Sequence, residues 1–273
     1  MTDLFRPSGV ITLTTDIGHQ GPFVASMKGV MLTRSPNVTI VDLTHNIMEH
    51  WPAEAGFWLE RCYHHFPTGS VHLAVVDPGV GTGRDIIAAV VDGHAFVAPD
   101  NGLLTPMLSR RPDAQIRHLD LSRAEEWKLG RISATFHGRD IFAPLAAEIA
   151  AGRLQLDALG PPAAELIPSW IDEPTVRDDH IKGLVITVDN FGNLITNIDA
   201  SMIEDWPDVF VHLGGRDIRF KRTYGDVKPG EYLALINSYG VLEVAKAESN
   251  AAEGLSVERG APVFARQSTD PEK

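Results

Sequence analysis

The sequence is poor in cysteine and has no long apolar run. Cys62 is the only cysteine among 273 residues, which excludes an internal disulfide and favours a reducing compartment. No apolar run approaches the roughly 20 residues that a membrane-spanning helix needs. Residues 1–7 also lack the basic stretch and apolar core of a signal peptide. We therefore predict a cytoplasmic protein without a membrane segment.

Positive charge is scarce as well. Lys and Arg number 24 against 36 Asp and Glu, which gives a formal net charge of −12. A nucleic-acid-binding surface needs clustered Lys and Arg, so this class of protein is not expected. The acidic balance is compatible with a small cationic substrate.

Several common catalytic and cofactor motifs are missing. The chain has 11 histidines but no His-Glu-x-x-His motif and no Cys/His cluster, so we expect no metal. It has no Gly-x-Ser-x-Gly elbow of a serine hydrolase. The Gly-x-Gly-x-x-Gly dinucleotide fingerprint is absent at the first strand, and residues 80–83 lack the lysine of a P-loop.

The first half of the chain alternates apolar runs with helical patterns. The apolar runs cover residues 10–16, 38–42 and 71–77, and helical spacing covers residues 22–34 and 52–66. Strand, helix, strand, helix, strand is typical of a parallel sheet with right-handed crossovers. The sequence therefore predicts an N-terminal α/β/α domain with a mainly parallel sheet.

Each of these three apolar runs ends in an aspartate: Asp16, Asp42 and Asp77. Ligands of such sheets bind beyond the carboxyl ends of the strands, where these side chains are expected. The alternative is that some of them cap helices or accept loop hydrogen bonds. Asp42 is the most probable structural aspartate, because nothing near it in the sequence indicates a site.

The rest of the chain predicts a second, all-β domain. A hairpin over 86–98 and helices over 103–108 and 141–151 complete the first domain. Prolines then gather among acidic residues, and we place the domains at 8–155 and 181–267 with a Pro-rich linker at 156–180. Short apolar runs in the second domain predict a small barrel or sandwich: 184–188, 194–198, 209–213, 218–220, 232–236, 241–245 and 263–265.

One stretch, residues 75–84, organises the candidate site. A strand ends on Asp77, and a turn rich in Pro and Gly returns Arg84 to the neighbourhood of that aspartate. This pattern indicates either a site or an ordinary turn with a surface ion pair. His137 before an apolar helix has a similar ambiguity, and so do the polar turns at 189–193 and 238–240.

Taken together, the motifs of this chain resemble those of the S-adenosyl-L-methionine (SAM) hydroxide adenosyltransferases, the adenosine-forming SAM hydrolases, which are related to the SAM-dependent fluorinase and chlorinase. The resemblance runs from about residue 10 to residue 265. Seven blocks carry it in order: Thr-Thr-Asp-Ile-Gly (14–18), Val-Asp-Leu-Thr-His (41–45), Val-Asp-Pro-Gly-Val-Gly (76–81), Ala-Pro-Asp-Asn-Gly-Leu (98–103), Thr-Phe-His-Gly-Arg-Asp (135–140), Asp-Asn-Phe-Gly-Asn (189–193) and Asn-Ser-Tyr-Gly (237–240).

The resemblance implies a role for individual residues. Catalytic residues that hold the attacking water match Asp77, Arg84 and His137. The ribose-binding aspartate matches Asp16, and the remaining substrate contacts match ten positions: Trp51, Phe136, Asp189, Phe191, Asn193, Ser238, Tyr239 and the segment Asn250-Ala251-Ala252. Of these, the methionine end maps to Asp189, Asn193, Ser238 and Tyr239, and the adenine to Phe191 and 250–252.

The implied reaction is attack of water on ribose C5′ of SAM, which gives adenosine and methionine without a cofactor. The resemblance also implies a homotrimer whose active sites lie between subunits. The halogenases carry a tyrosine where this chain has Asp77, and they lack the histidine at 137, so water is favoured over halide. A SAM-dependent halogenase, a non-catalytic SAM- or adenosine-binding protein and an unrelated metal hydrolase remain the alternatives.

Overall fold

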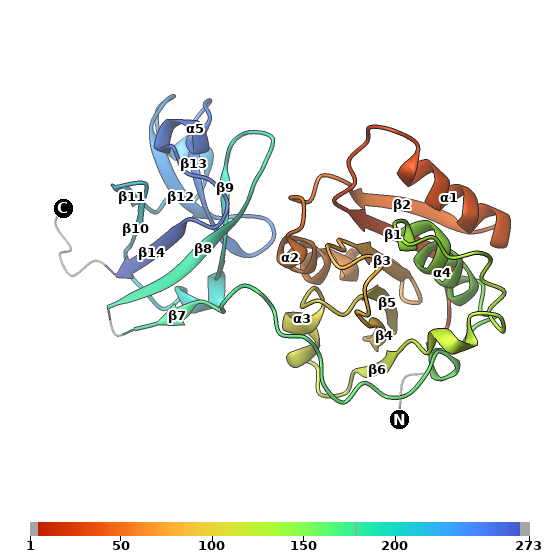
Figure 1. The fold of residues 1–273 in the computed structure, drawn as a ribbon. Coiled ribbons are helices and arrows are strands. Elements are labelled where there is room, and N and C mark those ends of the chain that lie inside the picture. Colours follow the sequence, from red (N-terminus) through yellow and green to blue (C-terminus); the bar gives the residue numbers. More distant parts are fainter. Residues whose placement is uncertain (1–4, 178, 268–273) are drawn as a thin grey trace. The chain divides into compact units, whose positions relative to one another are not determined.

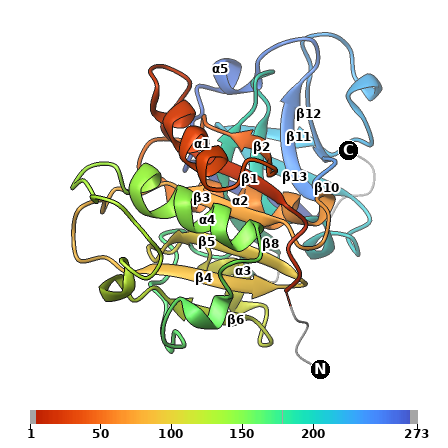
Figure 2. The same cartoon turned by 90° about the vertical axis from the view of Figure 1, so that its right-hand side faces the viewer.

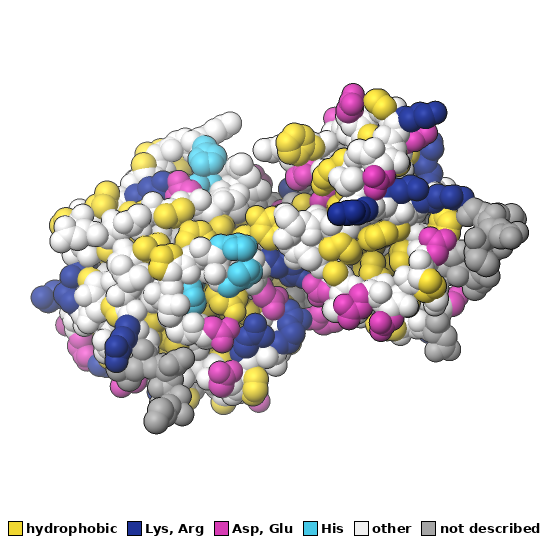
Figure 3. Space-filling view, turned by 180° about the vertical axis from the view of Figure 1, so that it is seen from behind, with side chains coloured by type: hydrophobic (Ala, Val, Ile, Leu, Met, Phe, Trp, Pro, Cys, Tyr) yellow, Lys and Arg dark blue, Asp and Glu magenta, His cyan; other side chains and the backbone are white. Residues whose placement is uncertain are grey.

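A computed structural model describes residues 5–177 and 179–267 of the chain (Figure 1). It contains two compact units, residues 1–171 and 172–273, which divide inside the Pro-rich segment. Within the described ranges, no helix combines the length and apolarity that crossing a membrane requires. On the face drawn in Figure 3, basic and acidic side chains are intermixed.

The first unit is built on a six-stranded sheet of mainly parallel strands, as predicted. In sheet order the strands are β2 (Thr39–Thr44), β1 (Val10–Thr15), β3 (Val71–Val75), β5 (His94–Pro99), β4 (Ile86–Val91) and β6 (Gln115–His118). The first four run parallel, and β4 and β6 are antiparallel to their neighbours. The helices are α1 (Phe23–Arg34), α2 (Pro52–Cys62), α3 (Thr105–Ser109) and α4 (Ala143–Ala150).

The structure corrects some predicted boundaries. The second strand does not end at Asp42: a register shift in β1 after Leu13 pairs Thr14 with Thr44 and extends β2 past the aspartate. Asp42 instead pairs with Lys28 of α1 at 2.6 Å. Helix α4 starts at Ala143, because a π-helical turn, Gly138–Phe142, precedes it. Strand β6 was not predicted, since its four half-buried residues form no apolar run.

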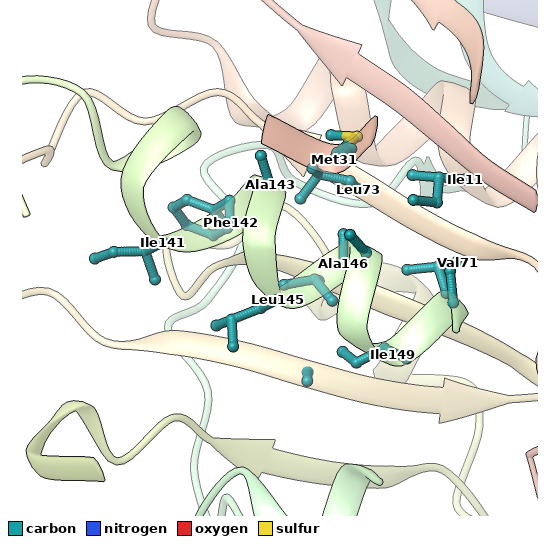
Figure 4. Packing of buried hydrophobic residues seen from close by; sticks show 14 of the residues in the cluster. Ile11, Met31, Val71, Leu73, Ile141, Phe142, Ala143, Leu145, Ala146 and Ile149 are labelled. Carbon is teal, nitrogen blue, oxygen red and sulfur yellow. The ribbon is translucent and has the colours of Figure 1, made fainter. Parts of the chain in front are cut away.

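Two apolar layers cover the sheet, because alternate residues of a strand face opposite sides. Leu73 and Val75 belong to the layer under α1 and α4, whereas Ala74 and Val76 belong to the layer with α2 and α3. Figure 2 shows α1 and α4 over one face of the sheet. Figure 4 shows how the π-helical turn and α4 insert Phe142, Leu145 and their neighbours against the strands.

The second unit is the predicted all-β domain. Its strands follow the order β11 (Arg216–Arg219), β10 (Val209–Leu213), β14 (Pro262–Gln267), β8 (His180–Val188), β9 (Leu194–Asp199), β13 (Val241–Lys246) and β12 (Tyr232–Ile236), with β7 (Thr175–Val176) beside β8. A bridge between Phe220 and Ala234 brings the two ends of this sheet together, so the unit is a nearly closed barrel. A short helix, α5 (Ala251–Leu255), was not predicted.

A buried chain of polar groups crosses the sheet of the first unit. Thr12 Oγ1 lies 2.8 Å from His72 Nδ1, and His72 Nε2 lies 3.0 Å from His94 Nδ1. Burial, followed by the neighbouring His94, lowers the pKa of His72 to about 3. Burial also lowers the pKa of His94, so both imidazoles are neutral near pH 7.

We predict that this chain of histidines makes the fold acid-sensitive. Between pH 6.5 and about 3 the unfolded state binds a proton at His72 that the folded state excludes. The free energy of unfolding should therefore fall by up to about 1.4 kcal/mol per pH unit as the pH drops through that window. Urea unfolding at pH 7, 6 and 5 should show a shallower fall in His72→Gln, and the exposed control His64→Gln should follow the wild type.

Candidate active site

The loop after β3 joins an aspartate to an arginine. Arg84 Nε donates to Asp77 Oδ1 at 2.9 Å and to Oδ2 at 3.1 Å, and Arg84 Nη2 also donates to Oδ2. Only 5% of the Asp77 side chain and 11% of the Arg84 side chain are exposed. The pair is therefore a shielded, bidentate ion pair rather than the surface pair that the sequence left open.

His137 completes this group from a distant part of the chain. Its Nδ1 lies 3.0 Å from Arg84 Nη2. A guanidinium can only donate hydrogen bonds, so Nδ1 must accept and the neutral ring carries its proton on Nε2. The arginine thus fixes both the position and the tautomer of the histidine. We refer to Asp77, Arg84 and His137 as the triad.

The electrostatics of the triad keep the histidine neutral. Burial lowers the pKa of His137, and the positive charge of Arg84 lowers it further, while Asp77 and Asp140 act in the opposite direction. The side chain is 8% exposed. The arginine also stacks over the ring of Phe142 with its Cζ 5.4 Å from the ring centre. The triad is thus anchored on the π-helical turn that follows His137.

The loop that carries His137 has its own clamp. Asp140 Oδ2 accepts hydrogen bonds from the backbone N of Ser133 at 2.8 Å and from Ser133 Oγ at 2.6 Å. Burial raises the pKa of Asp140, but bonds from Arg139 and Ser133 outweigh that effect and hold it at about 2. The carboxylate therefore stays charged and closes the loop between Ser133 and the π-helical turn.

Asp16 lies at the same sheet edge as Asp77, because β1 and β3 are parallel neighbours. Its Oδ2 accepts from the backbone N of His50 at 3.1 Å, and burial raises its pKa. Trp51 follows His50 directly and is the N-cap residue of α2. Phe136 packs edge-on against Phe23, with ring centres 5.5 Å apart. Asp16, Trp51 and Phe136 therefore all belong to the first unit.

The remaining predicted contacts belong to the second unit, and most of them gather around one loop. Asp189 Oδ1 accepts from the backbone N of Phe191 and of Asn193, both at 2.9 Å, and Phe191 is 78% exposed. The loop rests on α5: Gly192 O accepts from Ala252 N at 3.0 Å, and a Cβ on Gly192 would lie 2.1 Å from Asn250 Cγ.

Asn250 and Ala251 occupy the start of α5. Asn250 caps this helix, with its Oδ1 accepting from Glu253 N at 2.9 Å, and Ala251 is fully buried. Ser238 and Tyr239 lie apart from them, exposed on the tight turn between β12 and β13. The geometry thus groups Phe191 with Asn250 and presents Ser238 and Tyr239 on a separate turn.

A cavity of 540 Å³ adds residues that the sequence did not indicate. Its lining includes Asp189, Phe191, Asn193, Tyr224, Lys246 and Ser249. Tyr224 and Lys246 are new, since neither lies in a recognisable motif. Tyr224 OH donates to Glu243 Oε1 at 2.6 Å, and this hydrogen bond holds the ring at the cavity.

The two loops of the triad meet backbone against backbone at Gly81. This residue has a φ of +78°, and a Cβ there would lie 2.2 Å from the carbonyl oxygen of Ala134. Gly83, two residues on, has open space around its Cα and an ordinary φ. Of these two glycines, Gly81 is therefore the one that lets the His137 loop reach Arg84.

We predict that Gly81→Ala separates the two loops. The positive φ and the contact with Ala134 should cost about 1–3 kcal/mol of stability, and the displaced triad should lose at least about tenfold in turnover. Gly83→Ala is the matched control and should behave as the wild type. The measurements are thermal unfolding and turnover of both variants. Equal behaviour of the two would contradict the role of Gly81 in bringing the loops together.

Comparisons with known proteins match both units of the chain to one family. The N-terminal and C-terminal domains of the SAM hydroxide adenosyltransferases match residues 11–160 and 183–264. An (R)-S-adenosyl-L-methionine hydrolase of Thermus thermophilus is 37% identical over 91% of this chain and 96% of its own length. One from Methanocaldococcus jannaschii is 33% identical over 91% and 92%. A fluorinase of Actinoplanes is more distant, with 27% identity over 87% and 90%.

A solved structure shares the architecture. The crystal structure of an uncharacterised conserved protein from Thermotoga maritima is 34% identical, covers 94% of this chain and 99% of its own, and gives a TM-score of 0.86. The family match spans both units, and the hydrolases are more similar to this chain than the fluorinase is. The chain therefore belongs to the SAM hydroxide adenosyltransferase family.

Proposed function

We propose that this protein hydrolyses SAM to adenosine and L-methionine by in-line attack of water on ribose C5′. The triad carries this proposal, because it joins a carboxylate, a guanidinium and a neutral imidazole in one shielded group. The names of the curated relatives further suggest the (R) configuration at the sulfonium, and we propose that this epimer is the preferred substrate.

Asp77 is the group that receives a proton from the water in this proposal. Its Oδ2 accepts twice from Arg84, whereas Oδ1 accepts once and retains a second lone pair for the water. His137 uses Nδ1 to accept from Arg84, so its Nε2–H is a donor that orients the water oxygen. Arg84 holds both partners in register, and holding the water in line supplies the orientation effect.

The leaving group needs no acid. Breaking the C5′–S bond converts a sulfonium cation into a neutral thioether, so methionine departs without a proton, and the oxygen of the water becomes O5′ of adenosine. The two protons of that water end as the hydroxyl proton of adenosine and a proton released through Asp77. Because charge is lost along the reaction, a shielded site favours the transition state over the separated ions.

The substrate contacts are divided between the two units. Asp16 is proposed to accept from the ribose hydroxyls, with Trp51 and Phe136 beside it in the first unit. The loop at 189–193, the turn with Ser238 and Tyr239, and the Asn250-Ala251 segment are proposed to hold the adenine and the methionine. A homotrimer with the active site between subunits would combine both sets, and light scattering tests it: a fully active monomer would contradict this assembly.

We predict that Asp77→Asn lowers kcat for adenosine release from SAM by about 10²–10⁴-fold, because the proton acceptor is lost while the volume is kept. The control Asp42→Asn changes an aspartate on β2, the edge strand of the same sheet, that pairs with Lys28, and it should retain wild-type turnover. In ¹⁸O-labelled water the wild type should place the label in O5′ of adenosine. Formation of a 5′-halo-adenosine with chloride or fluoride would instead identify a halogenase.

We also predict the acid limit of the reaction. Protonation of His137 would remove the acceptor at Nδ1 and place a cation beside Arg84. Since burial and Arg84 lower the pKa of His137, the competent neutral form persists as the pH falls below 6.5. The acid limb of kcat/KM that belongs to this histidine should therefore lie below pH 6.5, and a midpoint above 6.5 would contradict the tautomer assignment.

A further inference from the structure

Glu243 is a buried carboxylate of the second unit that the proposed chemistry does not use. It lies on β13, is 3% exposed, and has the apolar neighbours Leu242 and Val244 in the chain. A buried charge is expensive unless hydrogen bonds satisfy it, so an apolar residue would serve the barrel equally well. This cost suggests a role for Glu243 beyond the fold.

One carboxylate oxygen of Glu243 holds a wall of the cavity. Tyr224 OH donates to its Oε1 at 2.6 Å, and the Tyr224 ring lines the cavity together with Phe191. Tyr224 is 46% exposed, and this hydrogen bond ties its hydroxyl to a buried residue. The hydrogen bond therefore fixes the orientation of a ring that lines the cavity.

The other oxygen holds the turn between β12 and β13. Asn237 Nδ2 donates to Glu243 Oε2 at 3.2 Å. Asn237 Oδ1 accepts from the backbone N of Tyr239 at 3.0 Å and of Val241 at 3.4 Å. Glu243 thus determines which way the Asn237 amide faces, and the amide shapes the turn that presents Ser238 and Tyr239.

We propose that Glu243 is a positioning residue that orients both Tyr224 and the 237–240 turn, so that the adenosine portion of the substrate meets a pre-organised ring and the methionine portion meets a pre-organised turn. The proposal rests on the proposed function. Burial raises the pKa of Glu243, and nearby Asp189 adds to that effect, while the bonds from Tyr224 and Asn237 oppose it. The two donors are thus what allows a carboxylate at this buried position.

The role predicts a separation of binding from chemistry. The hydrogen bonds of Glu243 go to residues of the second unit, whereas the triad belongs to the first. Loss of its two bonds should weaken ground-state and transition-state binding alike, which raises KM and leaves kcat within about threefold of the wild type.

The experiment compares Glu243→Leu, Glu243→Gln and Tyr224→Phe. Calorimetry gives Kd for the two products, adenosine and L-methionine, and steady-state assays give kcat and KM with SAM. Glu243→Leu should raise both product Kd values about tenfold, because it leaves Tyr224 and Asn237 without their acceptor. Tyr224→Phe should raise the adenosine value alone. Glu243→Gln retains hydrogen-bonding capacity and should stay within about threefold.

Asp217→Asn, on the exposed strand β11, is the control and should change nothing. If Glu243→Leu does not fold, Asn237→Ala takes its place and should raise the methionine Kd alone. Unchanged Kd values in Glu243→Leu, with normal turnover by the wild type, overturn this inference and leave the proposed function standing. A wild type that neither binds the products nor releases adenosine from SAM would contradict both this inference and the proposed function.

Discussion

The candidate active site depends on the position of one guanidinium. Arg84 makes the bidentate pair with Asp77 and donates to His137 Nδ1, so it joins two segments that are 53 residues apart in the chain. It neutralises the carboxylate, keeps the imidazole unprotonated, and selects the ring nitrogen that carries the proton. A lysine could supply the charge but not this fork of donors, because its ammonium has no planar, bidentate geometry.

Part of this site is readable from the sequence. Apolar runs that end in Asp16 and Asp77 place both carboxylates at one edge of a parallel sheet, and the Gly-rich turn returns Arg84 to Asp77. The approach of His137 is not readable in this way. It depends on the docking of two irregular loops, for which no periodicity exists, and only the resemblance to a family indicated it.

The second unit shows why the sequence did not predict the contacts of Tyr224 and Glu243. Tyr224 and Glu243 lie in different elements, 19 residues apart, and neither belongs to a motif. A buried glutamate on a strand looks in sequence like an ordinary solvent-facing residue of an alternating pattern. The barrel itself was predictable because short apolar runs repeat. The polar contacts between its segments depend on which segments become neighbours in the fold.

The π-helical turn Gly138–Phe142 ties the direction of His137 to the number of residues in this segment. A π-helical turn holds an additional residue within an otherwise regular helix, and each residue of a helix rotates the chain by about 100°. Removal of one residue would make the helix more regular and its backbone locally more stable. The same change would turn His137 away from Arg84. The less regular backbone thus lets His137 reach Arg84, and a change in the length of this segment would change the direction of one imidazole.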